Sequence, residues 1–413
     1  MGKASIIYVL GLSFIVSYGI LNINAAGTDA VDNFTTYYGR TLAHEIASSG
    51  ANIGCSDVFD NPTYMTPYND VTFKGGALDV TFAVAGNSKH VISIGSIVIG
   101  HQTIYDTVTV ELRNNTMAQY AWFSNFEANK GGQPTSWSTG DSAFGPIHTN
   151  DKFNINGAPV FMKKATAWKS AVPAKNSALW AGGYQWGIKI PYPTDLTAFI
   201  TAASDPDNGR LVSNTDAYLK MNPSGTINLK VPSKGIDTSF ASSTQFTQNG
   251  AFAVQGGNLY LEGTLTGDFA VGAVAQGGVG GYVYVTGDIR CHDNPRTNPA
   301  SQDRFALYAE NDIVVTYDNS NPVAYQNRSI DASIFTLKGD FEVQDAKSFA
   351  PRGLLTVYGS MMQYYRGEIG NVIGGTLKNG YHKNFRYDPR LAAFPPKYFP
   401  AMGRYLLFSW REN

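Results

Sequence analysis

Hydrophobic residues dominate the start of the chain. Residues 4–26 read ASIIYVLGLSFIVSYGILNINAA and carry no charge. At about 1.5 Å per residue, a helix of this length spans the ~30 Å hydrocarbon core of a membrane. Lys3 precedes the apolar run and favours a cytoplasmic start. The pattern predicts a transmembrane helix over residues 1–26. Its apolar surface comprises Ile6, Ile7, Val9, Leu10, Leu12, Phe14, Ile15, Val16, Ile20 and Leu21.

The helical pattern continues beyond this run. Apolar residues recur every four positions without a proline, and we expect Phe34, Tyr38, Leu42 and Ile46 to pack the helix against the folded body. Ile53 extends the stripe, and one of the glycines near it can end the helix. The expected element is one helix of about 45–50 residues, apolar in its first half and amphipathic in its second. A signal peptide cut near residues 24–26 is the alternative, which the length of the apolar run disfavours.

Apolar and polar residues then alternate, which predicts an antiparallel sheet. The alternation covers residues 77–86 and 90–115, with turn candidates at Gly86-Asn87 and Gly100-His101. Val108, Val110 and Leu112 form a sheet face that can pack against the helix. We therefore assign residues 27–125 to a domain of amphipathic helix plus antiparallel sheet, an arrangement that many α+β domains share.

A different pattern begins near residue 140. A nine-residue template, in which two apolar-x-apolar runs flank a turn, recurs at irregular intervals. Full copies occupy 283–291, 307–315 and 335–343, and looser copies occupy 147–155, 259–267 and 355–363. Such recurrence favours a β-solenoid or parallel β-helix-like body over residues 126–403. A large sandwich with ordinary hairpins is the alternative.

Two further segments complete the expected organisation. Residues 165–225 are predicted to be an inserted lobe, with a helix over 193–205 that Thr194 caps. The proline-rich stretch 381–400 is expected to wrap the body in irregular structure. A C-terminal strand then fills residues 404–413. The fold class is mainly β with a long N-terminal α-helix.

Composition excludes several classes of function. The net charge of −1 gives no electrostatic support for a nucleic-acid partner. The two cysteines, Cys55 and Cys291, exclude a disulfide-dense scaffold, although one bond between them stays open. The six histidines show no metal-ligand spacing, and His148 points outward in its template. We therefore predict no cofactor, no metal ligand and no catalytic residue.

One polar cluster leaves an enzymatic alternative open. It runs from His292 to Pro299 and continues into Asp303 and Arg304. A surface-anchored β-helix polysaccharide lyase or hydrolase would need acidic and basic side chains that converge on one groove, here Asp293, Asp303, Arg296 and Arg304. We favour a structural loop, because turn chemistry explains nearly every residue of the cluster. Asp388 and Arg390 are likewise expected to form a salt-bridged turn, and the glycine run 272–281 to form turns.

Several segments also resemble a known family. Residues 1–27, 33–54, 144–157, 285–299, 305–315, 351–367 and 380–391 are similar to type IV pilus-associated minor-pilin-like proteins of bacteria. The resemblance covers most of the chain and is weakest in the lobe 165–225. Pilins carry a Glu five residues after the processed Gly, whereas processing after Gly2 would place Ile7 there.

The resemblance implies a structural, non-catalytic protein of the bacterial cell surface or an extracellular filament, inserted in the inner membrane before assembly. Its implied partners are the membrane, other pilin-like subunits or further copies of itself, and a surface glycan or protein ligand for adhesion. The place of N-terminal processing, the ligand, and the choice between major subunit, minor subunit and plain anchor stay open.

Overall fold

The structure is a computed structural model that describes residues 2–85, 88–169, 177–316, 327–373 and 376–412. The chain divides into two compact units. One contains residues 1–115 and 403–413, and the other contains residues 116–402. Each unit has its own core and is described by itself.

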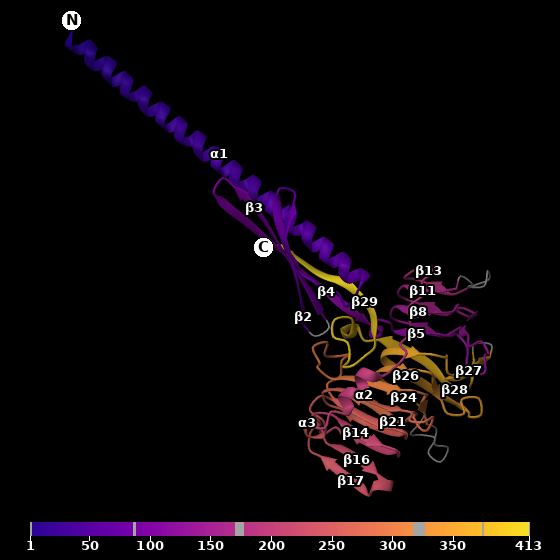
Figure 1. Ribbon diagram of the computed structural model, residues 1–413. Coiled ribbons are helices and arrows are strands. Elements are labelled where there is room, and N and C mark those ends of the chain that lie inside the picture. Colours follow the sequence, from indigo (N-terminus) through magenta and orange to yellow (C-terminus); the bar gives the residue numbers. More distant parts are fainter. Residues whose placement is uncertain (1, 86–87, 170–176, 317–326, 374–375, 413) are drawn as a thin grey trace. The chain divides into compact units, whose positions relative to one another are not determined.

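The first unit is built on one continuous helix, α1, which runs from Lys3 to Asp60 over 58 residues (Figure 1). No proline interrupts it, and it passes through residues 24–26 without a break. It ends at Asn61, whose backbone is extended and whose N–H donates to the carbonyl of Asp57 at 2.8 Å. The helix is thus longer than the sequence predicted, because neither Gly50 nor Gly54 ends it.

A five-stranded antiparallel sheet completes this unit. Its strands are ordered β1-β2-β3-β4-β29, so the C-terminal strand lies beside β4. Their bounds are Tyr68–Phe73, Gly76–Ala85, Ser88–Ile99, Gln102–Thr116 and Ala401–Glu412. The predicted turn Gly100-His101 joins β3 to β4, whereas the predicted turn Gly86-Asn87 lies outside the described residues. The C-terminal strand was predicted from the sequence, but its pairing with β4 was not.

The sheet packs on the second half of α1. Alternate residues of the strands, including the predicted face Val108, Val110 and Leu112, are fully buried. They meet a helix face that contains Ile46 and Val58. Burial of each such side chain stabilises the fold by roughly 1.5–3 kcal/mol.

The helix backbone comes close to β3 at Gly95. A Cβ atom at this position would lie 2.1 Å from the carbonyl oxygen of Ala43 and 2.5 Å from the backbone nitrogen of Ala47. Glycine therefore sets the spacing between helix and sheet.

The predicted packing stripe begins later than expected. Ile46 is fully buried and Leu42 packs partly against the core, but Phe34 and Tyr38 are 70% and 55% exposed. The first position that the sheet covers tightly is Gly39, where an added Cβ would lie 2.4 Å from the Cδ1 atom of Ile104. The assignment of Phe34 and Tyr38 to helix–body packing is therefore corrected, because the sheet does not reach them.

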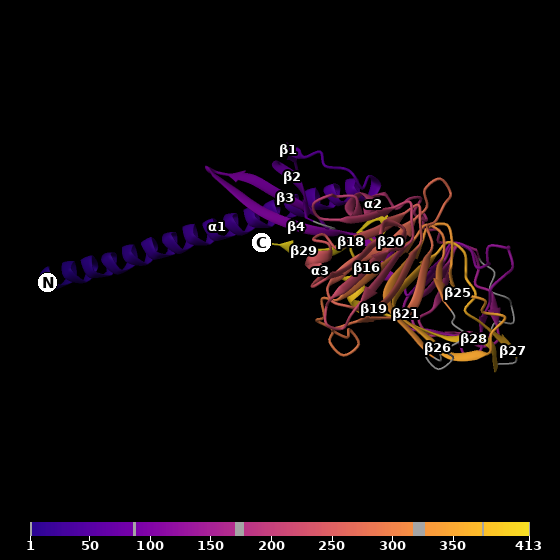
Figure 2. The same ribbon diagram turned by 90° about the horizontal axis from the view of Figure 1, so that it is seen from below.

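The second unit is a stack of parallel strands, visible edge-on in Figures 1 and 2. A first file of hydrogen-bonded parallel strands has the order β14-β18-β20-β22-β24-β26-β5-β8-β11-β13. A second file has the order β15-β19-β21-β23-β25. A third runs from the end of β21 through β24, β26, β28, β7 and β10 to β12. Apolar residues from all three files share one core.

The strands before residue 188 are β5 Trp122–Ser124, β6 Trp137–Ser138, β7 Ser142–Ala143, β8 Ile147–Thr149, β9 Ile155–Asn156, β10 Val160–Phe161, β11 Ala165–Ala167, β12 Leu179–Trp180 and β13 Tyr184–Trp186. The strands after residue 209 are β14 Arg210–Ser213, β15 Ala217–Met221, β16 Ile227–Val231, β17 Ile236–Phe240, β18 Ala251–Gln255, β19 Leu259–Leu265, β20 Asp268–Val274, β21 Val283–Cys291, β22 Arg304–Ala309, β23 Ile313–Val315, β24 Arg328–Thr336, β25 Phe341–Val343, β26 Pro351–Gln363, β27 Gly370–Ile373 and β28 Thr376–Tyr387.

The chain does not follow the stack in order. It builds upward from β5 to β13, crosses through residues 188–209, which include helix α2 (Thr197–Ala203), and restarts at the opposite end with β14. It then builds back until β26 and β28 pair with β5 and β7. The prediction of an inserted lobe over 165–225 is therefore wrong: β11 to β13 and β14 to β15 are members of the stack.

The crossing segment explains two other differences. It lies against the outer side of the first file, where Phe199 and Ile190 join a second core cluster. The segment 389–402 joins the same cluster through Leu391 and Phe399. The predicted helix is present, but its N-cap position is Leu196 rather than Thr194. Asp195, one residue earlier, accepts the N–H of Thr197 through Oδ1 at 2.9 Å.

The nine-residue template coincides with strands, but only some copies are divided into two strands at the bend. Residues 307–315 and 335–343 are divided in this way, whereas β19, β21 and β26 each continue as one strand across the bend. The pairing of β19 with β21 shifts register between Leu261 and Gly263, so an irregularity still marks the bend there. The stretch 381–400 also differs from the prediction, because β28 continues as regular strand to Tyr387, before the first proline.

Candidate functional site

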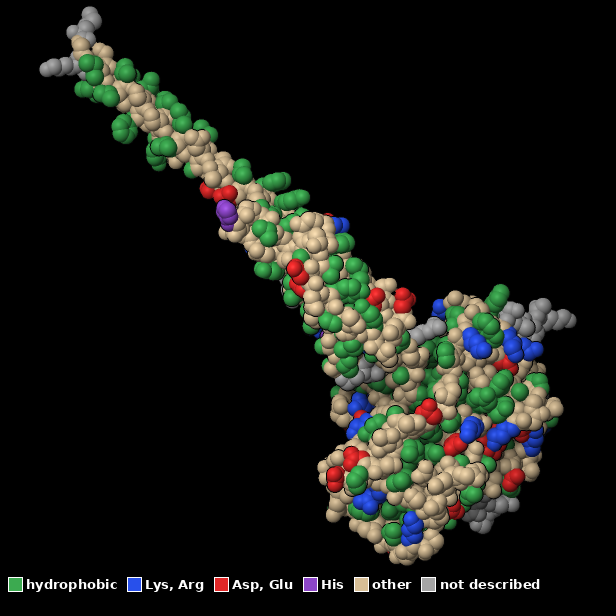
Figure 3. Space-filling model, in the orientation of Figure 1, with side chains coloured by type: hydrophobic (Ala, Val, Ile, Leu, Met, Phe, Trp, Pro, Cys, Tyr) green, Lys and Arg blue, Asp and Glu red, His purple; other side chains and the backbone are tan. Residues whose placement is uncertain are grey.

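The exposed half of α1 is the largest unpartnered apolar surface of the first unit. Within the described part of the chain, α1 is the one helix long and apolar enough to cross a membrane, and its apolar stretch is not buried by the unit. Figure 3 shows hydrophobic side chains along this half of the helix. All the predicted surface residues of this segment are at least half exposed, among them Phe14 at 78% and Ile15 at 72%.

Two polar side chains in this half bond to the helix itself. The hydroxyl of Ser13 donates to the carbonyl of Val9 at 2.6 Å, and that of Thr28 donates to the carbonyl of Asn24 at 3.0 Å. A polar side chain that bonds its own helix adds little cost in an apolar environment. This half of α1 therefore suits contact with lipid or with other apolar helices.

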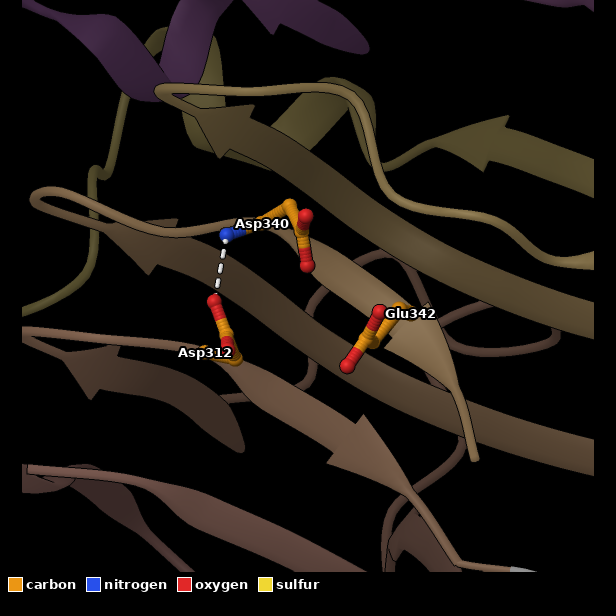
Figure 4. A group of neighbouring side chains, drawn as sticks. All are labelled: Asp312, Asp340 and Glu342. Carbon is orange, nitrogen blue, oxygen red and sulfur yellow. Dashed lines mark hydrogen bonds between the residues drawn. The ribbon is translucent and has the colours of Figure 1, made fainter. Parts of the chain in front are cut away.

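The second unit contains a group of three carboxylates that the sequence analysis missed. Asp312 precedes β23, Asp340 precedes β25, and Glu342 lies within β25 (Figure 4). One carboxylate oxygen of each lies within 4.8 Å of the others. The Lys130 ammonium forms an ion pair with Asp312 from a segment far away in the sequence.

Charge and burial perturb the titration of this group. Burial, reinforced by the charges of Glu342 and Asp312, raises the pKa of Asp340 to about 7. Burial and the charge of Asp312 also raise the pKa of Glu342. The signal that could have found the group is the template itself, because Asp312 and Asp340 both occupy its sixth position.

The junction between the two halves of the stack, where β26 and β28 pair with β5 and β7, contains buried ion pairs. Arg366 contacts Glu127, and both side chains are fully buried. Lys383 pairs with Asp141 at 3.1 Å. Burial lowers the pKa of Lys383. These pairs connect β28 and the segment after β26 to the segments on either side of β6.

His148 corrects a prediction. It was expected to point into solvent, but it is fully buried, because the crossing segment covers the outer side of β8. Its Nδ1 lies 2.7 Å from Thr166 Oγ1, and its Nε2 lies 3.1 Å from Asn150 Oδ1. Asn150 in turn accepts the N–H of Ile190 at 2.9 Å. Burial lowers the pKa of His148 to about 4, so this residue holds the crossing segment as a neutral side chain.

The four residues of the hydrolase alternative do not converge. Arg296 binds Asp331 through both of its terminal nitrogens, and Arg304 binds Asp268 at 2.7 Å. Asp303 accepts the backbone N–H groups of Gly267 and Asp293. The Asp293 side chain accepts from Asn298.

These contacts fit the structural loop predicted for residues 292–304, because its side chains bond to the backbone and to neighbouring side chains. The predicted turn at Asp388 is also present, with Arg390 Nη2 at 2.6 Å from Asp388 Oδ2. Both cysteines are free and buried, and burial raises the pKa of Cys55 to about 11 and that of Cys291 to about 12.

An aromatic groove lies on the outer side of the second file. Tyr218, Tyr260 and Tyr284 stack with ring centroids 4.6 and 4.9 Å apart. Beside them, Lys220 pairs with Glu262 at 2.9 Å. The groove has a volume of about 370 Å³ and is lined by Tyr218 and Tyr260 but not by Tyr284, which extends the tyrosine stack beside it. Its other polar lining residues are Lys220, Glu262, Asn228, Lys230, Asp237 and Thr286.

Comparisons with known proteins give limited guidance. Residues 77–169 match the family described as "Domain of unknown function (DUF4900)". No curated protein matches. Among solved structures, the chain is similar to the competence-associated pilin ComZ from Thermus thermophilus, with a TM-score of 0.35 and 12% identity over 91% of this chain and 97% of that one. Similarity at this level carries neither a fold nor a function to the chain.

Proposed function

We propose that the protein is a membrane-inserted, pilin-like structural protein of the bacterial cell surface. The apolar half of α1 anchors it in the inner membrane and then packs against the equivalent helices of other subunits. The observation that carries the proposal is one unbroken helix whose second half is the core of a folded unit and whose first half is apolar and exposed.

The exposed half of α1 needs an apolar partner. Transfer of one exposed Leu, Ile or Phe side chain to apolar surroundings gains roughly 1.5–3 kcal/mol, and this segment carries many of them. Lipid supplies such surroundings before assembly, and a bundle of identical helices supplies them afterwards. Because Ile7 replaces the expected Glu, subunit contacts at this position would be apolar packing without a charge pair.

A lysine in the middle of the segment tests this proposal. We expect Ile15→Lys to disfavour membrane insertion by about 3–4 kcal/mol, since a central Lys replaces a favourable Ile. The variant should move from the membrane fraction to the soluble fraction when cells are lysed and extracted with carbonate. Thr36→Lys, on an exposed turn of the same helix outside the segment, is the matched control and should stay with the membrane. Equal membrane retention of both variants would count against the anchor role.

We also propose that the three files of the second unit form a β-solenoid. Parallel pairings between successive rungs support this class. A double variant with Lys220→Cys and Glu262→Cys should cross-link on oxidation, because these exposed residues are paired neighbours on β15 and β19. Lys220→Cys with Thr286→Cys places the second thiol one rung further away and should not cross-link. The reverse result would contradict the order of the rungs.

Adhesion through the aromatic groove is the second candidate function. Tyrosine rings that offer apolar surface beside hydroxyl, amide and charged groups suit the mixed faces of a sugar. We expect an oligosaccharide to be the ligand. A glycan array with the detergent-solubilised protein, repeated with Tyr218→Ala and with Tyr105→Ala as an exposed aromatic control, tests this. Glycan binding that survives Tyr218→Ala would exclude the groove as its site.

A further inference from the structure

The register of the stack brings Asp312, Asp340 and Glu342 together. Strands β23 and β25 pair in parallel, with Ile313 opposite Phe341 and Val314 opposite Glu342. The residues that precede these strands, Asp312 and Asp340, are therefore stacked on adjacent rungs. Figure 4 shows the Asp340 and Glu342 carboxylates side by side, with Asp312 on the neighbouring rung.

Asp340 has a buried carboxylate oxygen without a donor. The residue is 2% exposed, and its Oδ1 atom is buried without a hydrogen-bond partner among the described residues. Its backbone N–H is satisfied, because it donates to Asp312 Oδ1 at 3.0 Å. A buried carboxylate oxygen without a donor is costly, so its position among two other carboxylates points to a cation.

The charge of the group is incompletely balanced. Three carboxylates face one ammonium, that of Lys130, which contacts Asp312. Glu368, the next carboxylate in the neighbourhood, already accepts from Lys347 Nζ at 2.5 Å and from Asn129 Nδ2 at 3.3 Å. Lys130 is 44% exposed, so its long side chain can swing into solvent when another cation enters.

We propose that Asp312, Asp340 and Glu342 bind a divalent cation, and that this cation is Ca²⁺. All three offer oxygen ligands, which hard cations prefer, and Ca²⁺ accepts the irregular geometry that two rungs of a stack provide. Water molecules complete the coordination on the side of Lys130. Mg²⁺ demands a near-ideal octahedron and keeps most of its own water, so it fits this group less well.

Cation binding is coupled to Lys130, whose ammonium forms an ion pair with Asp312. Lys130 competes with the ion for Asp312. Removal of this ammonium should therefore strengthen Ca²⁺ binding on the order of tenfold.

Calorimetry and thermal unfolding of the full-length protein in detergent test the site, with CaCl₂ as the probe and an EGTA-treated sample as reference. Ca²⁺ should bind with a measurable heat and should raise Tm more than Mg²⁺ does. Asp340→Asn should fold in EGTA, because it removes a buried carboxylate without change of shape, and should lose the Ca²⁺ response. Asp237→Asn, at an exposed carboxylate, should keep the response.

Lys130→Met distinguishes two interpretations of the group: a site that binds a metal cation, and a cluster whose charge is balanced by the Lys130 ammonium alone. Tighter Ca²⁺ binding by this variant supports the proposal. A wild-type protein without any Ca²⁺ response would overturn it, as would an equal response in Asp340→Asn. A larger response to Mg²⁺ than to Ca²⁺ would also contradict the proposed identity of the ion.

Discussion

Arg366→Met is the sharpest test of how the two halves of the parallel stack are joined, where β26 and β28 pair with β5 and β7. The Arg366 guanidinium is fully buried against the carboxylate of Glu127. Its nitrogens also donate to the carbonyls of Thr135 at 2.9 Å and Ser136 at 3.2 Å, and its cationic group lies 4.5 Å from the ring centroid of Trp137. Methionine keeps the length of the side chain and removes every one of these polar contacts.

The expected cost follows from these contacts. An unpaired buried charge costs about 3–5 kcal/mol, and each abandoned backbone carbonyl adds about 1 kcal/mol where water cannot reach it. We expect Arg366→Met to destabilise the second unit by about 5–7 kcal/mol, the sum of these costs. The double variant Glu127→Gln with Arg366→Met leaves no unpaired charge and should recover about 2 kcal/mol.

Hydrogen–deuterium exchange is the suitable assay, because it measures the opening of one region in a protein with two units. Exchange should accelerate on β5 and β8, which stack beyond the buried pair, while α1 stays protected. Tryptophan fluorescence reports the same event, since Trp122 and Trp137 lie at the pair. A loss below 1 kcal/mol, or a double variant worse than Arg366→Met alone, would refute the reasoning.

Three further predictions concern packing and pH. Ile46→Ala should cost about 2–5 kcal/mol in urea unfolding of the first unit, because the side chain is fully buried, whereas Phe34→Ala should stay within about 0.5 kcal/mol. Gly95→Ala should cost more than about 1 kcal/mol because its Cβ meets the helix backbone, while Gly27→Ala, with open space around it, should stabilise the helix by up to about 1 kcal/mol. In EGTA, the contribution of Asp340 to the free energy of unfolding should be largest below pH 3.8 and should fall as the pH rises from there to about 7. The reason is that the folded state keeps a proton on Asp340 that the unfolded chain has already released. The fall amounts to at most about 4 kcal/mol and should disappear in Asp340→Asn, whereas a flat pH profile of the difference between the two proteins would contradict it.

Local patterns in the sequence predicted most of the elements. The apolar run and the four-residue repeat gave a long helix, and strict alternation gave the sheet and its buried face at Val108 and Val110. Both depend on neighbours within a few residues. The failure at Phe34 and Tyr38 has a physical reason, because periodicity says which side of a helix is apolar but not where the covering sheet ends.

The order in which the strands are stacked could not be predicted from the sequence. The template marked strands, but nothing in one rung states which rung lies next to it, so the restart of the chain at β14 was taken for an inserted lobe. His148 was misplaced for the same reason, since the segment that covers it follows about 40 residues later. The carboxylate group was missed because its members come from different rungs, although the repeated aspartate of the template was visible.

N-terminal sequencing of the mature protein, isolated from the cell surface, tests the central claim most directly. A chain that begins at Met1 or Lys3 retains the apolar half of α1, as an anchor or as a processed pilin-like subunit, and we predict one of these two starts. A chain that begins near Ala26 would lack that half of the helix and would contradict the account.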